Sequence, residues 1–296
     1  MNIKIPEQKI ICIAGSTGFI GKSAAIFFQS NGFKVVSITR KDLNQGTRHI
    51  TSMIDGSEML INVVGASIQK KWTKAYKKEI YNSRIITTKI LIDAIKLTKN
   101  KPKVFVSSSA VGIYNSIDIH DEFSEKYSGS FLGKVCRNWE REAFKLMNLK
   151  ETRLVIFRYG IVLGRNGGAF PNILRSFKFF LGSVLGDGYQ WFPFVHIEDV
   201  LSAYWFVLVN KNAHGIYNVV VPNLVPYNRF CQIVAKTIKR PCWLKIPFVF
   251  LKLRFGEFAA VLTEGQHVKP HRLIREGFYF QYPTAEKTVK ALLHKK

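Results

Sequence analysis

The apolar residues of this chain gather in short runs that alternate with longer amphipathic stretches. Runs rich in β-branched residues at 10–14, 34–39, 58–64, 103–108 and 153–157 are typical of buried strands. Between them, the spacing of apolar positions predicts helices over 73–98 and 130–147. Strands that alternate with helices are joined by crossover connections, so the pattern predicts an α/β fold with a doubly wound parallel sheet of the Rossmann type.

The pattern becomes less regular after Gly164. Glycine and aromatic residues dominate 164–170 and 185–191, which is typical of loops that cover a pocket. Further along, the predicted elements are helices over 200–209, 227–238 and 284–293 and a strand over 215–219. We therefore predict a Rossmann domain over 1–164 and, over 165–296, a mixed segment that adds helices and strands to the sheet and forms a smaller C-terminal substrate lobe.

Three glycines follow the first predicted strand. Gly15 permits a tight turn, Gly18 lets backbone N–H groups approach phosphates, and Gly21 lets the next helix pack close to the sheet. A second strand follows that helix, which completes a βαβ unit and favours a dinucleotide site over a purely structural turn. The candidate contacts are Gly15, Ser16, Thr17, Gly18, Phe19, Ile20 and Gly21.

The end of the second predicted strand indicates which dinucleotide is bound. An NAD site usually offers a carboxylate to the ribose, whereas an NADP site offers cations to the 2'-phosphate. Here Arg40 can donate two charge-assisted hydrogen bonds to a phosphate, and Thr39 can add a hydroxyl. We predict NADP(H); a solvated basic turn is the alternative, and Asp42 would oppose a phosphate.

Composition bounds the class of protein. With 296 residues and 47% hydrophobic content, the chain can bury a sizeable core. The first residues lack the pattern of a signal peptide, and no apolar run approaches the roughly 20 residues of a membrane span, so we expect a soluble cytoplasmic protein. The cysteines lack metal-ligand spacing and are expected to be reduced thiols, with no metal site.

The net charge of +24 suggests attraction to nucleic acid, anionic membranes or phosphorylated ligands. The charges are dispersed, however, and aromatic residues do not interleave with them as in single-strand-binding proteins. We favour a solvated lysine-rich surface over a functional polyanion-binding one. The densest basic group is Lys70, Lys71, Lys74, Lys77 and Lys78.

Nine ordered segments together resemble the extended short-chain dehydrogenase/reductase superfamily and, within it, the YfcH-like epimerase family. Besides the glycine turn, they include 62–66, 71–73, 83–84, 109–114, 139–140, 158–164, 196–199 and 265–270. The resemblance implies an NADP(H)-dependent oxidoreductase or epimerase-like enzyme for an unidentified small carbonyl or hydroxyl substrate, with a sugar nucleotide as one option. The cofactor contacts that it adds are Val63, Val64, Glu79, Arg84 and Val162. Gly65 joins this set because it ends a strand and has no side chain to bar a ligand.

The catalytic residues of the superfamily are matched only in part. Ser109 matches the hydroxyl that binds the substrate carbonyl, but the tyrosine position holds Leu132 and the lysine position holds Cys136. Lys134 is two residues away, about 200° around a helix, and should point elsewhere. Tyr114 is the next candidate proton donor, and a packed loop tyrosine is the alternative.

The sequence suggests roles for four more residues. For His196 the sequence favours a structural hydrogen bond over catalysis, and for Arg158 it favours an internal ion pair over a substrate contact. Gln190 and Trp191 could line the substrate side. The retained serine favours an enzyme. The missing tyrosine and lysine favour a catalytically weak NADP(H)-binding sensor or partner-binding protein, and the sequence leaves the oligomeric state open.

Overall fold

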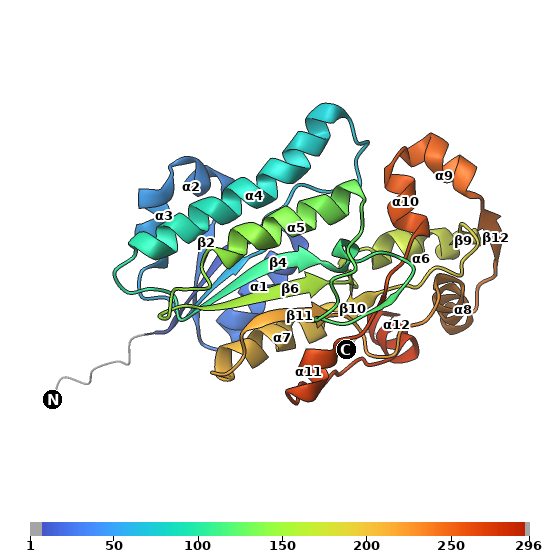
Figure 1. Cartoon of the computed structure of the whole chain (residues 1–296). Coiled ribbons are helices and arrows are strands. Elements are labelled where there is room, and N and C mark those ends of the chain that lie inside the picture. The colour runs from blue at the N-terminus through green and yellow to red at the C-terminus, as the bar shows by residue number, and fades with distance from the viewer. Residues whose placement is uncertain (1–7, 294–296) are drawn as a thin grey trace.

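The computed structural model describes residues 8–293 as a parallel sheet covered by helices on both faces, with a smaller lobe at one end (Figure 1). The sheet strands are β1 (Ile10–Ala14), β2 (Lys34–Ile38), β3 (Met59–Asn62), β4 (Val104–Ala110), β6 (Arg153–Tyr159) and β11 (Gly215–Val219). All six are parallel, in the order β11-β6-β4-β3-β1-β2. The predicted α/β class and Rossmann-type sheet are thus confirmed.

The strand order reverses next to β1. The chain places β2 on one side of β1 and then returns to place β3 on the other side. In open α/β sheets such a switch leaves a crevice at the carboxyl ends of the strands, where ligands bind. The residues that follow β1, β2, β3 and β4 therefore share the edge of the sheet where a site is expected.

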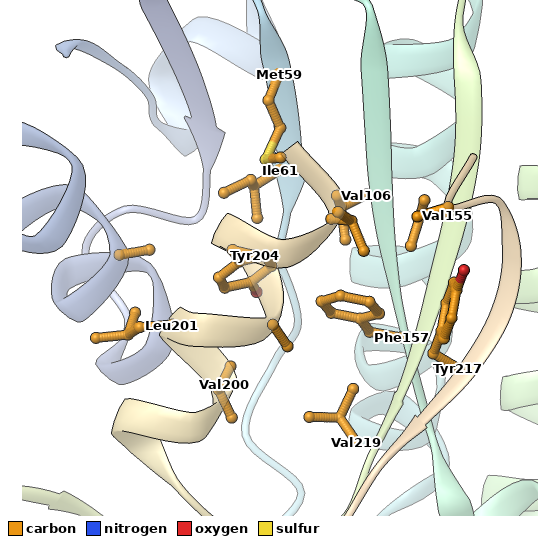
Figure 2. Close-up of a cluster of buried hydrophobic side chains, with 14 of the residues drawn as sticks. Met59, Ile61, Val106, Val155, Phe157, Val200, Leu201, Tyr204, Tyr217 and Val219 are labelled. Carbon is orange, nitrogen blue, oxygen red and sulfur yellow. The ribbon is translucent and has the colours of Figure 1, made fainter. Parts of the chain in front are cut away.

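Helices cover both faces of the sheet (Figure 1). On one face lie α1 (Phe19–Ser30) and α7 (Ile197–Val209), and on the other lie α3 (Thr47–Ile54), α4 (Lys74–Leu97) and α5 (Phe131–Phe144). Figure 2 shows Val200 and Tyr204 of α7 beside Phe157 of β6 and Val106 of β4. Because both faces are covered, β3 and most of β4 are continuous buried runs.

Side-chain caps fix where several helices begin. The Thr73 hydroxyl accepts from the amide of Tyr76 at 3.1 Å, so α4 begins one residue after the predicted start. His196 Nδ1 accepts from the amide of Glu198 at 3.2 Å, so α7 begins at Ile197, ahead of the prediction.

The lobe has its own apolar core. It consists of α6 (Phe170–Lys178), β9 (Gly182–Leu185), α8 (Tyr227–Ile238), β12 (Cys242–Ile246), α9 (Phe248–Phe255), α10 (Phe258–Thr263) and α12 (Ala285–Leu293). β9 and β12 pair in parallel. Phe170 and Phe177 of α6 pack in the lobe core with Phe230 of α8, so the segment after Gly164 contains more regular structure than we predicted. Pro171 stands in the first turn of α6, where proline is tolerated.

The remaining elements are short. They are α2 (Arg40–Asn44), a 3-10 helix (Val111–Ile113), β5 (Ile119–His120), β7 (Ile161–Gly164), β8 (Gly167–Gly168), β10 (Phe194–His196), β13 (His267–Val268) and α11 (His271–Arg275). β10, β7 and β8 form a small sheet, and β13 pairs with β5. The pattern did not predict α2 and α3, which lie between β2 and β3.

The last third of the chain returns to the sheet core. Leu273, Phe278 and Phe280 are buried with the strand residues on the α1 and α7 face. Residues on both sides of Gly164 therefore share one core.

Candidate functional site

The glycine turn between β1 and α1 packs against the end of β3. Gly15 has φ +91°, and a Cβ on it would lie 2.9 Å from the carbonyl carbon of Val63. A Cβ on Gly21 would lie 2.2 Å from the carbonyl oxygen of Gly15. These positions therefore exclude any side chain and leave a backbone-lined cradle at the switch point.

The start of α1 can hold an anion in that cradle. Gly18 is the N-cap and has no side chain to occupy the first amides of this 12-residue helix. Ser16 is half-buried and Thr17 is exposed beside them, while Ile20 packs against the sheet core. Free N–H groups at a helix start bind phosphate oxygens, so the turn fits a dinucleotide pyrophosphate.

The hairpin of β7 and β8 reaches the same turn. A Cβ on Gly164 or Gly167 would lie 2.3 or 2.2 Å from ring atoms of Phe19. Gly168 approaches the carbonyl of Val162 in the same way. The hairpin glycines thus accommodate the ring of Phe19 and bring Val162 toward the glycine turn.

The carboxyl end of β2 holds the residues predicted to recognise a 2'-phosphate. The hydroxyl of Thr39 donates to Asp42 at 2.6 Å, and His49 lies 3.4 Å from the same carboxylate. Hydrogen bonds from Thr39 lower the pKa of Asp42. Asp42 is therefore held by its own helix cap, and the Thr39 hydroxyl proton is already used. Arg40 is exposed and makes no hydrogen bond or ion pair within residues 8–293, so its guanidinium can reach a ligand.

Arg84 is half-buried rather than exposed. Its guanidinium donates to the carbonyls of Ile80 and Ala66 at 3.0 and 3.1 Å and lies 5.4 Å from the ring centre of Trp139. A Cβ on Gly65 would lie 2.9 Å from this guanidinium, so the glycine makes room for Arg84 in this structure. Burial lowers the pKa of Arg84. Arg84 is thus not a solvated helix charge, whereas Glu79, on the same helix, is exposed.

Ser109 belongs to a buried network of charged and polar side chains. Its hydroxyl donates to Glu140 Oε1 at 2.6 Å. Arg158 holds both oxygens of that carboxylate, at 2.7 Å from Nε and 2.6 Å from Nη2. Arg158 also donates to the Tyr114 hydroxyl at 2.6 Å, and that hydroxyl donates to Asn218. Arg158 is therefore an internal ion-pair partner, as the sequence favoured.

This network constrains Ser109 and Tyr114. Ser109 has a single hydroxyl proton, and Glu140 accepts it. Burial raises the pKa of Tyr114 to about 12, and its hydroxyl also contacts the carbonyl of Asp121 at 2.8 Å. This geometry favours the packed role of Tyr114 that the sequence left open, and proton donation by Tyr114 stays a prediction.

Neither Leu132 nor Cys136 of α5 can replace the tyrosine and the lysine that the superfamily has at these positions. Leu132 is half-buried, Lys134 is exposed, and Cys136 is buried. Burial raises the pKa of the Cys136 thiol to about 11, so it is protonated at neutral pH. The cation that acts on this thiol from α4 is Arg84, which lowers the pKa of Cys136 against that effect.

The residues predicted on the substrate side lie at the junction with the lobe. Trp191 stacks on His267 with ring centres 4.0 Å apart. Gln190 Nε2 donates to the carbonyls of Leu185 and Leu262, while its buried Oε1 has no partner within residues 8–293. A cavity of about 280 Å³ in the lobe lies elsewhere, lined by residues of β9, α8 and β12 such as Lys245, and includes none of the predicted contacts.

Sequence reasoning assigned no role to Glu140 or Asn218. The signal was present, because a charged residue on the apolar side of α5 and an amide within an apolar strand need buried partners. Single-sequence reading cannot pair them, since Glu140 and Asn218 are far apart in the chain.

Comparison with known proteins identifies the family of the chain. Residues 11–220 match the model of the NAD dependent epimerase/dehydratase family, and the chain belongs to that family. Residues 246–292 match a domain of unknown function, DUF1731.

The similarity extends over almost the whole chain. It is 32% identical to the chloroplastic SDR39U1 homolog of Arabidopsis thaliana, an epimerase family protein, over 97% of this chain and 87% of that protein. It is also 32% identical to epimerase family protein SSP1921 of Staphylococcus saprophyticus, over 97% and 100%. The crystal structure of human SDR39U1 with NADPH is 28% identical, covers 96% of this chain and 98% of that one, and has a TM-score of 0.89.

Proposed function

We propose that the protein is an NADP(H)-dependent oxidoreductase or epimerase-like enzyme acting on a small carbonyl or hydroxyl compound. The observation that carries the proposal is the side-chain-free cradle at the switch point, where Gly15 packs against Val63 and Gly21 packs against Gly15. The NADPH bound to human SDR39U1 supports the same cofactor.

Different residues around the cradle contact different parts of the cofactor. Amides of 15–21 hold the pyrophosphate, and Arg40 pairs with the 2'-phosphate. Val63, Val64, Gly65, Arg84, Glu79 and Val162 complete the set of contacts. When bound, the cofactor supplies hydride transfer at C4 of its nicotinamide.

Ser109 sets which substrate atom can bind beside the cofactor. Because its proton is donated to Glu140, its free lone pairs accept a hydrogen bond. The arrangement therefore favours a substrate that presents a hydroxyl, with Glu140 and Arg158 holding the serine in place. Ser109 orients that hydroxyl, and we assign the transfer of its proton to a water molecule.

A second candidate is a catalytically weak NADP(H) sensor. The observation that favours it is the loss of both superfamily groups, because Leu132 has no proton to give and burial keeps Cys136 as a neutral thiol. In this reading the cofactor orders the junction between sheet and lobe, and a partner recognises that state.

The cofactor assignment is tested by titrating the protein with NADPH and NADH and following nicotinamide fluorescence. Arg40→Gln is expected to weaken NADPH binding by roughly 10- to 100-fold and to leave NADH binding nearly unchanged, because only NADPH carries the 2'-phosphate. Lys41→Gln, at the exposed neighbouring residue, is the matched control. Equal NADPH affinity in the Arg40 and Lys41 variants would reject the assignment.

A label-transfer experiment separates enzyme from sensor. The protein is incubated with NADP and a mixture of small alcohols that carry deuterium at the carbinol carbon and, for the reverse direction, with C4-deuterated NADPH and the corresponding carbonyl compounds. Deuterium in a product, lost in Ser109→Ala while NADPH binding is retained, supports the enzyme. Tight NADPH binding without transfer in either direction supports the sensor.

A further inference from the structure

The outer edge of the lobe gathers exposed apolar side chains. They belong to two segments, 170–185 and 239–255, whose strands β9 and β12 pair with each other. Figure 1 shows β12 and α9 at the end of the molecule far from the N-terminus. The exposed residues are Phe179, Phe180, Leu181, Trp243, Phe248, Val249, Phe250 and Leu253. We call this surface the lobe edge.

The start of the paired strands holds one half of the lobe edge. Trp243 Nε1 donates to the carbonyl of Phe180 at 3.1 Å, and the guanidinium of Arg240 lies 4.3 Å from the Phe180 ring centre. Phe180 has φ +61°, which is unfavourable for a bulky residue, and yet its ring is 54% exposed. An aromatic pair is thus held toward solvent beside a cation.

Helix α9 forms the other half, and apolar residues lie on its exposed side. Leu251 is buried against the lobe, and Val249 and Leu253 are each two residues from it, about 200° around the helix. They therefore point away from the protein and are 64% and 79% exposed. A helix that only covers a core would place polar residues there.

All charged residues in the two segments of the lobe edge are basic. The two segments contain no aspartate or glutamate. Lys245 shares the exposed side of β12 with Trp243, and Lys252 and Arg254 flank the apolar side of α9. The basic residues of the two segments are Arg175, Lys178, Lys239, Arg240, Lys245, Lys252 and Arg254.

This chemistry discriminates among possible occupants. A second copy of the chain, docked about a two-fold axis, would bring the same cations face to face. Nucleic acid would gain little from the aliphatic Leu181, Val249 and Leu253, which cannot stack on bases as aromatic rings do. A bilayer with anionic headgroups accommodates both features, because apolar side chains enter the boundary of headgroups and acyl chains while lysine and arginine reach the phosphates.

We propose that the lobe edge binds the surface of an anionic lipid bilayer. No helix within residues 8–293 is long and apolar enough to cross a membrane, so the contact lies on the bilayer. The proposal does not depend on the cofactor site, since none of its residues is a predicted cofactor contact.

Co-sedimentation of the full chain with vesicles tests the proposal. The protein should sediment with phosphatidylcholine vesicles that contain about 30% phosphatidylglycerol, less so as salt rises, and only weakly with pure phosphatidylcholine. Lys245→Gln with Lys252→Gln should lower the partition coefficient roughly 25-fold, since each basic residue near the surface contributes about fivefold. Val249→Asn with Leu253→Asn should lower it at least as much.

Matched controls lie at the C-terminal end of α4, away from the lobe edge. Lys96→Gln with Lys99→Gln makes the same change in net charge, and Leu97→Asn polarises an equally exposed leucine. Equal losses in the control and lobe-edge variants, or equal binding to neutral and anionic vesicles, overturn the proposal. So does a dimer in sedimentation velocity that the Val249 and Leu253 changes dissociate, if the parent protein does not sediment with vesicles. The thermal midpoints of all variants verify folding.

Discussion

Replacing Arg158 with methionine removes the cation from the buried network and leaves Glu140 behind. The side chains of Arg158 and Glu140 are 1% and 5% exposed and share two hydrogen bonds of 2.7 Å or less. Removing one partner of such a pair typically costs about 3–5 kcal/mol, because the remaining charge is uncompensated in a medium of low dielectric constant. We expect Arg158→Met to lower the free energy of unfolding by about 4 kcal/mol at pH 8.

The charge left on Glu140 is the source of this cost, so removing that charge as well should restore stability. Adding Glu140→Gln to Arg158→Met should recover much of the loss at pH 8, since no buried charge is then left unpaired.

Urea unfolding of both variants at pH 8, followed by tryptophan fluorescence, measures the loss and its recovery. Lys103→Met is the control, since the Lys103 side chain is 68% exposed and its ion pair with Glu58 should be worth less than about 1 kcal/mol. A cost below about 1 kcal/mol for Arg158→Met would contradict the expected effect of an uncompensated buried charge. A double variant as unstable as Arg158→Met at pH 8 would contradict it as well.

Two further predictions concern the glycine turn and a buried carboxyl. Gly21→Ala should weaken NADPH binding more than tenfold, because its Cβ would lie 2.2 Å from the carbonyl oxygen of Gly15 and displace the turn; NADPH titration with circular dichroism checks it. Burial raises the pKa of Asp199 to about 6, so its contribution to stability should fall by up to about 3 kcal/mol as pH rises from 4 to 6. Asp199→Asn should flatten that slope in urea titrations.

Each of these predictions has a matched control. A Cβ on Gly18 would be 3.4 Å from the same oxygen, so Gly18→Ala should affect NADPH binding less than Gly21→Ala, and the reverse order would contradict the geometry. Asp118 has a pKa lowered by its hydrogen bond to Lys126, so its stabilising contribution is lost as pH falls, the opposite direction from Asp199. A steeper slope in Asp199→Asn than in the parent protein would contradict the assignment.

Strand and helix pattern predicted the sheet well because burial on both faces leaves continuous apolar runs. The strand over 215–219 has the predicted bounds, and β3 differs from its prediction by a residue or two at each end. The family and the Rossmann-type fold that the motifs implied are confirmed. The division at residue 164 and the residue-level contacts stay predictions.

Two of the predicted cofactor contacts have protein partners in the structure that the sequence pattern did not indicate. Gly65 was expected to admit a ligand, and in the structure it admits the guanidinium of Arg84, which comes from the next helix. Thr39 was expected to serve a phosphate, and its proton goes instead to Asp42, three residues along. Capping and packing of this kind depend on geometry that apolar periodicity does not encode.

The shared core has a consequence for how the chain is made. The edge strand β11 and the helix α7 come after residue 190, and Phe278 and Phe280 complete the same face of the sheet. While the ribosome has released only the first half of the chain, α7 is absent, and Val106 of β4 lacks the cover that this helix provides. We therefore expect the sheet to fold late in synthesis, with the nascent first half dependent on chaperones until the last strand and tail emerge.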